Sequence, residues 1–427
     1  MQKIVFSTLF TLMGLFASAL TVTNCQPGEL QRHIRNCNIT QLQVSGSIDA
    51  RDFRFIADSL RHLTALDLSD ATIEAFSGKA LFANVEEYVA GEVPCLSLAS
   101  MLELTNFVLP HTATRLGDGC FSGCTHLKYV ELFENLTHIG DYAFSGCAQL
   151  ETLLVPESLS SIGDGAFSNC PSLESIETIP ELPGHTSSGT ASALHIGYRA
   201  FANCPSLKIV VPGKELNGLD AEAFAATGLE GLNLKNQLSL TTLPDWVFSE
   251  SELSELTLPS NLQSIGDGAL MGDDGITTLT LPATVNYIGS YAMAYMTGLK
   301  QLESKPTKVP ELGDSVWYGV EQSTVKLNVS PQSLADYRAA AQWCNFLMTS
   351  LQRGDVNADG LVDIADVNII INIMLGKDSA DNYDGRAYLT EGDTDVDIAD
   401  VNASINLMLG RRRAMRLAAL AAEQAQQ

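Results

Sequence analysis

The chain has 427 residues, of which 45% are hydrophobic, and this is sufficient for a folded protein of two or three domains. It carries 50 acidic residues against 25 basic ones, which gives a formal net charge of −25. Such an excess of acid argues against nucleic acids and anionic membranes as the main partners, and it favours a secreted, cation-binding protein.

Residues 1–19 are predicted to be a secretory signal peptide. Lys3 supplies the positive start, Ile4 to Phe16 form the apolar segment, and Ala17-Ser18-Ala19 is a small-residue cleavage site. A transmembrane anchor needs roughly 20 apolar residues, and neither this run nor any later one is long enough to span a bilayer. We therefore expect a secreted, extracellular protein that is either soluble or tethered to the cell surface by other means.

Residues 20–114 are predicted to form an N-terminal cap with degenerate repeats. Ile39 to Val44 and Leu63 to Ser69 show the spacing of the strand segments found later in the chain. A repeat array must cover the open end of its core, so an atypical first repeat is expected. Cys25 and Cys37 flank a short amphipathic stretch, and the sequence leaves open whether they form a disulfide.

Residues 115–300 carry the strongest pattern, a phrase of the form Ile139-Gly140-Asp141-Tyr142-Ala143-Phe144. The phrase begins at Leu116, Ile139, Ile162, Ile196, Leu219, Leu243, Ile265 and Ile288. The spacing is 22 to 24 residues except for one interval of 34, which holds a Pro/Gly/Ser/Thr-rich insertion between Thr178 and Ala193. This period predicts an α/β-type solenoid of leucine-rich repeat class, with about eight 23-residue repeats plus caps.

One large apolar residue from each phrase is expected to stack on its neighbours and form a continuous core. These residues are Phe121, Phe144, Phe167, Phe201, Phe224, Phe248, Leu270 and Met293. Cys124, Cys147, Cys170 and Cys204 follow the phenylalanines at a constant offset, and later repeats have Thr227, Ser251 and Asp273 at that place. Disulfides or a metal are the alternatives, but this substitution pattern favours a column of small buried residues.

A Leu-x-x-Leu-x-Leu segment follows most of the phrases and predicts a half-buried strand. Its outward positions form the predicted binding face of a solenoid that binds a protein or a glycan. They are Tyr129, Glu131, Thr152, Leu154, Ser175, Glu177, Asn233, Glu255, Thr257, Thr278 and Thr280. The positions are mostly polar with few aromatic residues, so they do not indicate whether the ligand is a protein or a glycan.

Residues 301–350 are predicted to close the solenoid at its C-terminal end. The elements expected there are a strand from Val325 to Val329 and a helix from Leu334 to Phe346. Tyr337, Trp343 and Phe346 would lie over the final coil. A ligand-binding cluster of the three aromatic side chains is the alternative, and capping of the core is the favoured interpretation.

Residues 354–410 have a different composition, with 12 acidic residues against two basic ones. The segment from Gly354 to Asp366 places oxygen-bearing side chains at loop positions 1, 3, 5, 9 and 12, with a glycine at position 6. This spacing predicts a Ca²⁺ loop followed by a helix. The predicted ligands are Asp355, Asn357, Asp359, Asp363 and Asp366, with the backbone carbonyl of Leu361.

A second copy follows 34 residues later, where Asp397 to Asn402 repeats Asp363 to Asn368. The front half of this copy departs from the pattern, because Leu389 takes position 1 and Thr394 takes the place of the turn glycine. Binding of Ca²⁺ at this second loop is therefore expected to be weaker, to occur in another register, or to be absent. Its candidate ligands are Glu391, Asp393, Asp395, Asp397 and Asp400.

The basic, Ala-rich tail at residues 411–427 begins with Arg411-Arg412-Arg413. A phosphate or membrane patch is one interpretation, and a solvated helix end, where positive charge suits the helix dipole, is the favoured one.

The repeats resemble the BspA-type leucine-rich repeats of exported bacterial proteins, and the duplicated loop and helix at 354–410 resembles a type I dockerin, a small EF-hand-like helical domain. These resemblances imply an adhesion or binding protein at the bacterial cell surface, with a Ca²⁺-dependent module that attaches to a cohesin-like partner. The alternative they imply is an accessory subunit of a polysaccharide-degrading complex, recruited through the same module.

The sequence shows no arrangement that suggests catalysis. The seven histidines are scattered, and there is no Gly-x-Ser-x-Gly motif and no phosphate-binding glycine loop. The Gly-Asp pairs of the repeats are interpreted as turn residues. We therefore predict a non-catalytic protein with Ca²⁺ as its cofactor.

Overall fold

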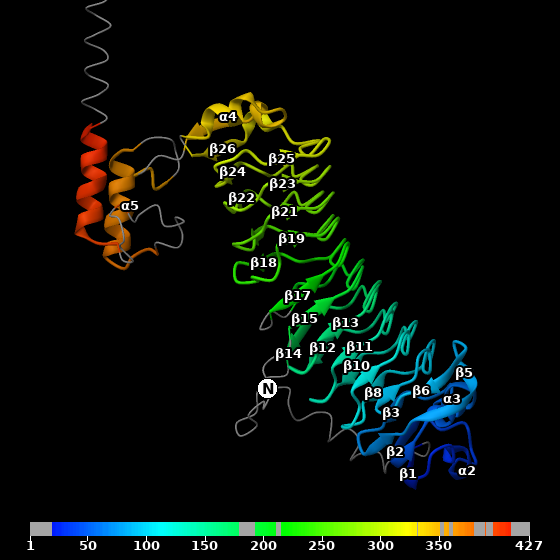
Figure 1. The fold of residues 1–427 in the computed structure, drawn as a ribbon. Helices are drawn as coiled ribbons and strands as arrows, with labels where there is room; N and C mark the ends of the chain where they lie inside the picture. The colour runs from blue at the N-terminus through cyan, green and yellow to red at the C-terminus, as the bar shows by residue number, and fades with distance from the viewer. Residues whose placement is uncertain are drawn as a thin grey trace, which may run out of the picture. The chain divides into compact units, whose positions relative to one another are not determined.

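The computed structural model describes residues 19–178, 193–210, 215–330, 332–350, 354–357, 362–379, 389 and 396–410 (Figure 1). The predicted signal peptide, the insertion after Thr178 and the basic tail lie almost entirely outside these residues. The chain forms two compact units, one made of Met1–Thr277, Tyr287–Leu299 and Glu311–Val320, and the other of Thr278–Asn286, Lys300–Pro310 and Glu321–Gln427.

The first unit is a solenoid in which each coil contributes strands to parallel sheets. The first sheet follows the order β1-β2-β3-β8-β10, with β4 paired to β2. Further along the chain its place is taken by the sheets β12-β14-β16 and β18-β20. The bounds are β1 (Ala19–Cys25), β2 (Gln41–Ile48), β3 (Ala65–Asp67), β4 (Ala71–Ile73), β8 (Asn106–Val108), β10 (Tyr129–Glu131), β12 (Thr152–Val155), β14 (Ser175–Thr178), β16 (Ile209–Val210), β18 (Gly231–Asn233) and β20 (Glu255–Thr257).

A second row of short parallel strands precedes the turns that carry the repeated phrase. Its strands are β7 (Glu92–Val93), β9 (Arg115–Leu116), β11 (His138–Ile139), β13 (Ser161–Ile162), β15 (Leu194–Ile196), β17 (Leu216–Leu219), β19 (Thr242–Leu243), β21 (Ser264–Ile265), β23 (Tyr287–Ile288) and β25 (Glu311–Leu312). The first apolar residue of each phrase ends one of these strands, and Ile139 pairs with Leu116 on one side and Ile162 on the other. The predicted 23-residue period is therefore the length of one coil.

The regular coils extend beyond the predicted 115–300 core on both sides. Val93 pairs with Leu116, so a full coil precedes the first recognised phrase, and β25 belongs to a coil that follows the last one. These coils escaped the sequence pattern because Pro94 and Cys95 replace Gly-Asp in the first, and Trp317 replaces the phenylalanine in the last.

The core of the first unit is a stack of aromatic rings, as the sequence predicts. From Phe121 to Phe248, consecutive rings lie 5.1 to 5.7 Å apart and within 12° of parallel. Leu270 and Met293 occupy the same column in the following coils and are fully buried. Each stacked pair adds about 1 kcal/mol to the burial of its apolar surface, so the column holds neighbouring coils together.

The start of the solenoid contains α2 (Leu30–His33), α3 (Ala50–Ser59) and an antiparallel hairpin of β5 (Phe76–Phe82) and β6 (Val85–Tyr88). The sequence pattern did not predict the hairpin. Cys25 and Cys37 are both free thiols, the first buried and the second exposed, so the disulfide considered between them is not present.

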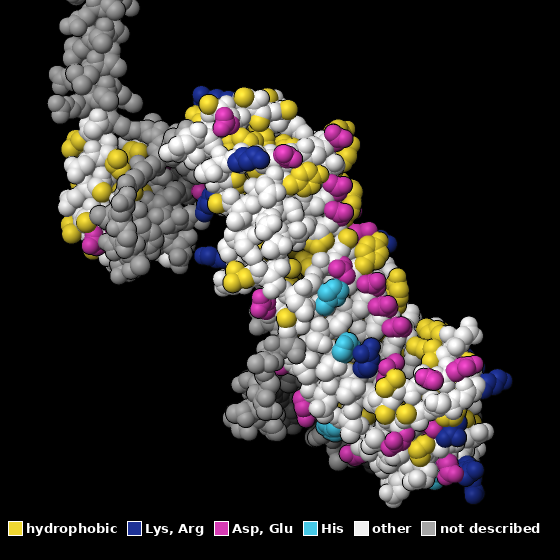
Figure 2. Space-filling model, in the orientation of Figure 1, with side chains coloured by type: hydrophobic (Ala, Val, Ile, Leu, Met, Phe, Trp, Pro, Cys, Tyr) yellow, Lys and Arg dark blue, Asp and Glu magenta, His cyan; other side chains and the backbone are white. Residues whose placement is uncertain are grey.

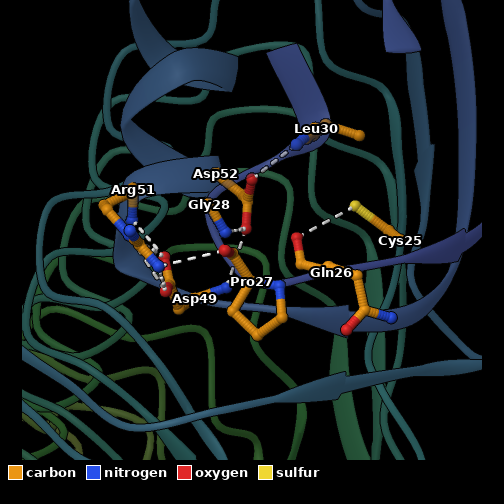
Figure 3. Close-up of polar contacts among 8 residues, drawn as sticks. All are labelled: Cys25, Gln26, Pro27, Gly28, Leu30, Asp49, Arg51 and Asp52. Atoms are coloured by element: carbon orange, nitrogen blue, oxygen red, sulfur yellow. Dashed lines mark hydrogen bonds and ion pairs between the residues drawn. The ribbon is translucent and has the colours of Figure 1, made fainter. Parts of the chain in front are cut away.

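A hydrogen-bond network at the start of α3 ties this helix to the loop before α2 (Figure 3). The buried Asp52 carboxylate accepts backbone N–H bonds from Gly28 at 2.7 Å, Leu30 at 2.9 Å and Asp49 at 2.9 Å. The Asp49 side chain caps the helix by accepting the Arg51 N–H, and the Arg51 guanidinium contacts the Asp49 carboxylate in turn. The network therefore joins segments that lie more than 20 residues apart in the chain.

The second unit contains the parallel sheet β22-β24-β26-β27, with β22 (Thr278–Leu281), β24 (Gln301–Ser304), β26 (Lys326–Val329) and β27 (Leu347–Ser350). The short helical segments η2 (Gln322–Thr324), α4 (Leu334–Ala339) and η3 (Trp343–Asn345) lie between these strands in sequence. The predicted helix from Leu334 to Phe346 is wrong in its second half. Ala340 is extended and Gln342 has φ of 62°, so the helix ends at Ala339.

The three aromatic residues predicted to cap the core are buried in this unit. The Tyr337 hydroxyl lies 2.7 Å from the Ser304 hydroxyl, and the Trp343 indole N–H donates to the Pro310 carbonyl at 3.1 Å. Because their polar groups are satisfied internally, these side chains act as core residues, and the ligand-cluster alternative is not supported.

The C-terminal part of this unit has two described helices, α5 (Ile364–Met374) and a helix at 398–410. Their apolar faces share a small core of buried side chains, Val356, Val367, Ile370, Leu389 and Val401. None of the helices in the described part of the chain is long and apolar enough to cross a membrane.

Candidate functional site

The predicted binding face lies on the outward positions of the solenoid strands. Tyr129 is 46% exposed and Leu154 is 42% exposed. The other positions that are exposed are Thr152, Glu177, Asn233, Glu255, Thr257 and Thr278. Residues opposite one another on neighbouring strands, such as Asn233 and Thr257, align across coils. Within the first unit the face is therefore a polar ribbon with isolated apolar side chains, and Thr278 and Thr280 lie in the second unit.

Three of the predicted positions differ from this description. Ser175 is buried, because β14 lies between β12 and β16 and the Ser175 hydroxyl donates to the Thr152 hydroxyl at 3.3 Å. Glu131 and Thr280 are half-buried. A small side chain between two neighbouring strands is covered by longer ones, which the alternation of residues along a single strand does not reveal.

The Gly-Asp pairs of the phrase form a ladder of hydrogen bonds along the turns. The Asp118 carboxylate accepts the Asp141 N–H at 3.0 Å, the Asp141 carboxylate accepts the Asp164 N–H at 2.8 Å, and Asp245 accepts the Asp267 N–H at 2.8 Å. The prediction that these acids are turn residues is confirmed. The ladder also leaves a row of carboxylates at successive coils, with Asp118, Asp141, Asp245 and Asp267 exposed to solvent.

The residue after each Gly-Asp pair has a left-handed backbone conformation in every regular coil. A large side chain recurs at this position in every second coil, and in three places glycine follows it, as in Tyr142 (φ 54°) followed one coil later by Gly165 (φ 57°), and Trp246 (φ 57°) followed by Gly268 (φ 59°). Arg199 and Tyr291 are followed by Glu222 and Ser315. A Cβ atom at Gly165 would lie 2.5 Å from the Tyr142 ring, and one at Gly268 would clash with the Trp246 ring. Each ring therefore lies over the backbone of the next coil.

This alternation was missed by the sequence reasoning, although it is visible in the repeats once they are aligned. The large residues recur at every second coil as Leu96, Tyr142, Arg199, Trp246 and Tyr291. The signal is a second spacing of about two coils, and it is obscured in the sequence by the insertion before Arg199 and by Glu222 and Ser315, which stand where glycine would be expected.

The cysteine column is buried and consists of free thiols, as predicted. The Cys124 Sγ donates to the Leu98 carbonyl at 3.0 Å, and the Cys147 Sγ donates to the Phe121 carbonyl at 3.3 Å. Burial raises the pKa of Cys124 to about 12 and that of Cys147 well above its ordinary value. These thiols stay protonated at neutral pH, so they have neither the charge nor the access of a metal or redox site.

Asp273 occupies the same column three coils after Cys204 and is fully buried. The Ser251 hydroxyl donates to its Oδ1 at 2.6 Å, while its Oδ2 has no hydrogen-bond partner in the described part of the chain. Burial raises the pKa of the Asp273 carboxyl to about 8. The group is therefore largely protonated at neutral pH, and it is a core residue without access to a ligand.

The start of α5 contains the described part of the predicted Ca²⁺ loop. The buried Asp366 carboxylate accepts backbone N–H bonds from Val356 at 2.7 Å, Asn357 at 3.1 Å and Asp363 at 2.8 Å. The Asp363 side chain caps the helix by accepting the Ala365 N–H at 2.7 Å. Loop positions 2 and 3 are thereby held against the residue at position 12.

The helix at 398–410 begins in the same way. The buried Asp400 carboxylate accepts the Leu389 N–H at 2.5 Å and the Asp397 N–H at 3.0 Å, and Asp397 accepts the Ala399 N–H at 2.6 Å. The duplication recognised in the sequence is therefore also a duplication of hydrogen-bonding geometry. Glu391, Asp393 and Asp395 lie outside the described residues, as do Asp359 and Leu361 of the first loop.

The chemistry of the first loop fits a hard cation. The described members Asp355, Asn357, Asp363 and Asp366 offer only oxygen ligands, Asp355 and Asp366 are buried, and no lysine or arginine occurs between 354 and 366. Within the described residues alone, no group of three or more acidic, histidine or cysteine side chains is arranged to hold a metal ion.

Comparison with protein families matches the chain to the BspA type leucine rich repeat region, in six copies covering residues 96–188, 185–300 and 266–340. Comparison with curated proteins finds no match.

Several solved structures are similar to the chain. A leucine-rich repeat protein of T. pallidum is 24% identical, covers 43% of this chain and 71% of its own, and has a TM-score of 0.29. The pneumococcal vaccine antigen PcpA is 16% identical, with 72% and 78% coverage and a TM-score of 0.37. A leucine-rich repeat protein from Eubacterium ventriosum is 19% identical, with the same two coverages and a TM-score of 0.38.

Proposed function

Because the chain belongs to the BspA-type leucine-rich repeat family, whose model matches more than half of it, we propose that it is a non-catalytic extracellular binding or adhesion protein. The observation that carries the proposal is the extended strand face, where exposed residues of successive coils lie in register. A repeated surface of this kind suits a long ligand, either a protein or a glycan.

The turn and core geometry supports a binding role over an enzymatic one. The recurring Asp residues serve the turn ladder, and the recurring Cys residues are buried. Asp273, the acid with a pKa near neutrality, is enclosed in the core. The acidic and thiol side chains that recur along the repeats therefore have structural roles in the coil.

The strand face is tested by presenting the full chain to a panel of extracellular-matrix proteins and to a glycan array. Tyr129→Ala and Leu154→Ser remove the two exposed hydrophobic side chains of the face, and Tyr287→Ala, on the second row of strands, is a matched exposed control. We expect the first two substitutions to weaken binding to whichever panel responds, and the control to leave it unchanged. Binding that survives both face substitutions, or that depends on Tyr287, would contradict the proposed site.

We further propose that residues 354–410 form a dockerin-like module that binds Ca²⁺ and attaches the protein to a partner at the cell surface. Support comes from the two helix starts with the same Asp-x-x-Asp hydrogen bonds and from the shared apolar core between the helices. Asp355, Asn357, Asp359, Asp363, Asp366 and the Leu361 carbonyl would hold the ion. Bound Ca²⁺ would neutralise the loop carboxylates and stabilise the folded module.

The duplicated helix start also favours a second candidate function, an accessory subunit of a polysaccharide-degrading complex. The two candidates differ in the partner of the module. Pull-down of the full chain on cohesin domains in Ca²⁺ and in chelator distinguishes them, since capture that requires both Ca²⁺ and Asp355 supports the complex. Absence of capture leaves the adhesion protein, held at the surface by another receptor.

A further inference from the structure

The turn side of the solenoid has a surface that the strand face does not include, and we define it as the turn-edge ridge. Its aromatic members are Tyr142, Tyr198, Trp246, Tyr291, Tyr295 and Tyr318. Its acidic members are Asp118, Asp141, Asp164, Asp245, Asp267 and Asp314. Figure 2 shows acidic and hydrophobic side chains interspersed along this edge of the coils. All of these residues belong to the first unit.

Five of the six aromatic members are exposed, and Trp246 is half-buried. Tyr142 is 53% exposed and Tyr291 is 42% exposed, although aromatic side chains are usually buried. The rings of Tyr142, Trp246 and Tyr295 lie against Gly165, Gly268 and Gly319 of the next coil. One face of each ring is supported by backbone, which leaves the opposite side available to solvent.

The spacing of the ridge follows from the coils. Backbone hydrogen bonds join the left-handed positions of adjacent coils, as in Tyr142 N–H to the Asp164 carbonyl at 2.7 Å and Trp246 N–H to the Asp267 carbonyl at 2.8 Å. Neighbouring coils are therefore about 4.8 Å apart, and large residues at every second coil recur at about 10 Å. An extended peptide covers the same distance in three residues.

The acidic members give the ridge an excess of negative charge. Carboxylates at successive coils repel one another, and the ladder orders them through hydrogen bonds without neutralising them. In the eight-residue turn segments of the regular coils from Gly117 to Val320, the one basic residue is Arg199. A cationic ligand would relieve this repulsion.

Arg199 shows how the ridge holds a cation. Its Nε lies 2.9 Å from the Glu222 carboxylate, and its guanidinium carbon lies 5.8 Å from the centre of the Tyr198 ring. The Tyr198 hydroxyl donates to the same carboxylate at 2.8 Å. A guanidinium group is thus placed between an aromatic ring and an acid, which is a favourable environment for arginine.

Two coils before Arg199 and two coils after it, an aromatic residue, Tyr142 or Trp246, stands at the position of Arg199 itself, and glycine takes the place of Glu222 one coil later. Each ring follows an exposed aspartate, Asp141 or Asp245, in the chain. We propose that the turn-edge ridge is a docking surface for an extended, arginine-bearing segment of a partner protein. Its arginines would stack on the rings of Tyr142 and Trp246 and face the neighbouring carboxylates, which is the kind of environment that Arg199 has between Tyr198 and Glu222.

The proposal is tested with a labelled peptide of four Arg-Gly-Ser repeats, whose arginines recur at every third residue. Binding to the full chain in saturating Ca²⁺ is followed by fluorescence anisotropy. The comparison peptides have the same composition with the four arginines adjacent, or lysine in place of arginine. We expect the spaced arginine peptide to bind at least threefold more tightly than either, and its affinity to fall as salt is raised.

Two double variants separate the ring from the charge. Tyr142→Ala with Trp246→Ala should weaken binding at least tenfold. Asp141→Asn with Asp245→Asn keeps the Oδ1 acceptor of the turn ladder and removes only charge, so it should weaken binding several-fold without unfolding the chain. Tyr129→Ala, on the strand face and similarly exposed, is the matched control and should have no effect.

Several results would overturn the proposal. Unchanged affinity in the ridge variants, loss of binding in Tyr129→Ala, or no binding at low salt would each exclude this docking surface. Equal affinity for the clustered arginine peptide would show attraction by net charge alone. Self-association that disappears on deletion of 411–427 would assign the ridge to the Arg411-Arg412-Arg413 tail of a second copy in place of a partner protein. Because the strand face is intact in all ridge variants, these results do not bear on the proposed function.

Discussion

The helices α3 and α5 begin in the same way in two different units of the molecule. Each has an Asp-x-x-Asp start in which the first aspartate caps the helix. The second aspartate, Asp52 or Asp366, is buried and accepts two N–H bonds from an earlier segment and one from the first aspartate. Backbone N–H groups stabilise the buried charge in both places, and the helix start holds a loop in position.

The two helix starts differ in the origin of positive charge. In α3 the residue before the second aspartate is Arg51, whose guanidinium contacts Asp49 and donates to the Pro27 carbonyl at 3.0 Å. In α5 the same place is taken by Ala365, while the preceding loop adds Asp355 and Asp359. The chain supplies its own cation at α3, and the proposed Ca²⁺ module implies that α5 takes its cation from solution.

The largest effect is expected from removing the buried acceptor at α3. Asp52→Ala leaves three backbone N–H groups without their partner, and it should lower the free energy of unfolding by about 4 kcal/mol. Urea unfolding of the full chain, followed by circular dichroism, measures this change. Asp58→Ala, an exposed acid on the same helix, is the control and should change stability little. A similar loss in both variants would show that the N–H bonds to Asp52 contribute nothing particular.

Asp273, a buried carboxylate with one oxygen that has no hydrogen-bond partner in the described part of the chain, should make the stability of the chain depend on pH. Asp273 has a raised pKa of about 8, so the folded state binds its proton more tightly than the unfolded state does. Its contribution is fully favourable below about pH 4 and is lost as pH rises to about 8. Asp273→Ser should therefore stabilise the chain by about 3 kcal/mol near pH 8 and by much less near pH 4. The free energy of unfolding of both chains, measured from pH 4 to pH 8, tests the sign of this pH dependence. A stabilisation by Asp273→Ser that does not vary with pH would contradict the prediction.

Removal of the intrinsic cation should have a smaller effect. Arg51→Ala leaves the buried Asp49 without the guanidinium, and we expect a loss of about 2 kcal/mol, limited by the exposure of the arginine side chain. Arg51→Lys keeps the charge and should recover part of the loss. Stability equal to that of the unchanged chain would mean that solvent alone neutralises Asp49.

The smallest effect is expected from giving α5 the arginine of α3. Ala365 is exposed, so Ala365→Arg should be tolerated and should bring a guanidinium close to Asp363. We expect the free energy of Ca²⁺ binding to the module to become less favourable by about 1 kcal/mol, because the added positive charge competes with the ion. The Ca²⁺ concentration required for folding of the module should therefore rise a few-fold. Ca²⁺-dependent amide hydrogen exchange of residues 354–410 measures it. Ala365→Gln is the control for side-chain size and should leave the Ca²⁺ dependence as it is.

The parts of the fold that repeat could be predicted from the sequence. Phe121 to Phe248 and the cysteine column recur at one position of every coil, so periodicity alone identifies them as core. The helix starts at Asp363 and Asp397 were also visible because the chain repeats them. Elements that occur once were missed, such as the β5–β6 hairpin and the break after Ala339, since their geometry depends on contacts outside the local pattern.

The candidate site could be predicted only in part, for a related reason. Alternation along a strand correctly placed Tyr129 and Leu154 on the surface, but it could not show that neighbouring strands cover Ser175. The turn-edge ridge depends on pairs such as Tyr142 and Gly165, which are 23 residues apart and meet only when coils stack in register. The network around Asp52 likewise joins Gly28 and Leu30 across the chain.

The central claim, that α5 needs a cation from solution, is tested most directly by calorimetric titration of the full chain with Ca²⁺ at physiological salt. The account predicts a binding heat that is lost in Asp355→Ala and retained in Asp58→Ala, which removes an exposed acid from α3. Equal binding in both variants, or none in the unchanged chain, would contradict it and leave residues 354–410 as an acidic helical segment without a metal.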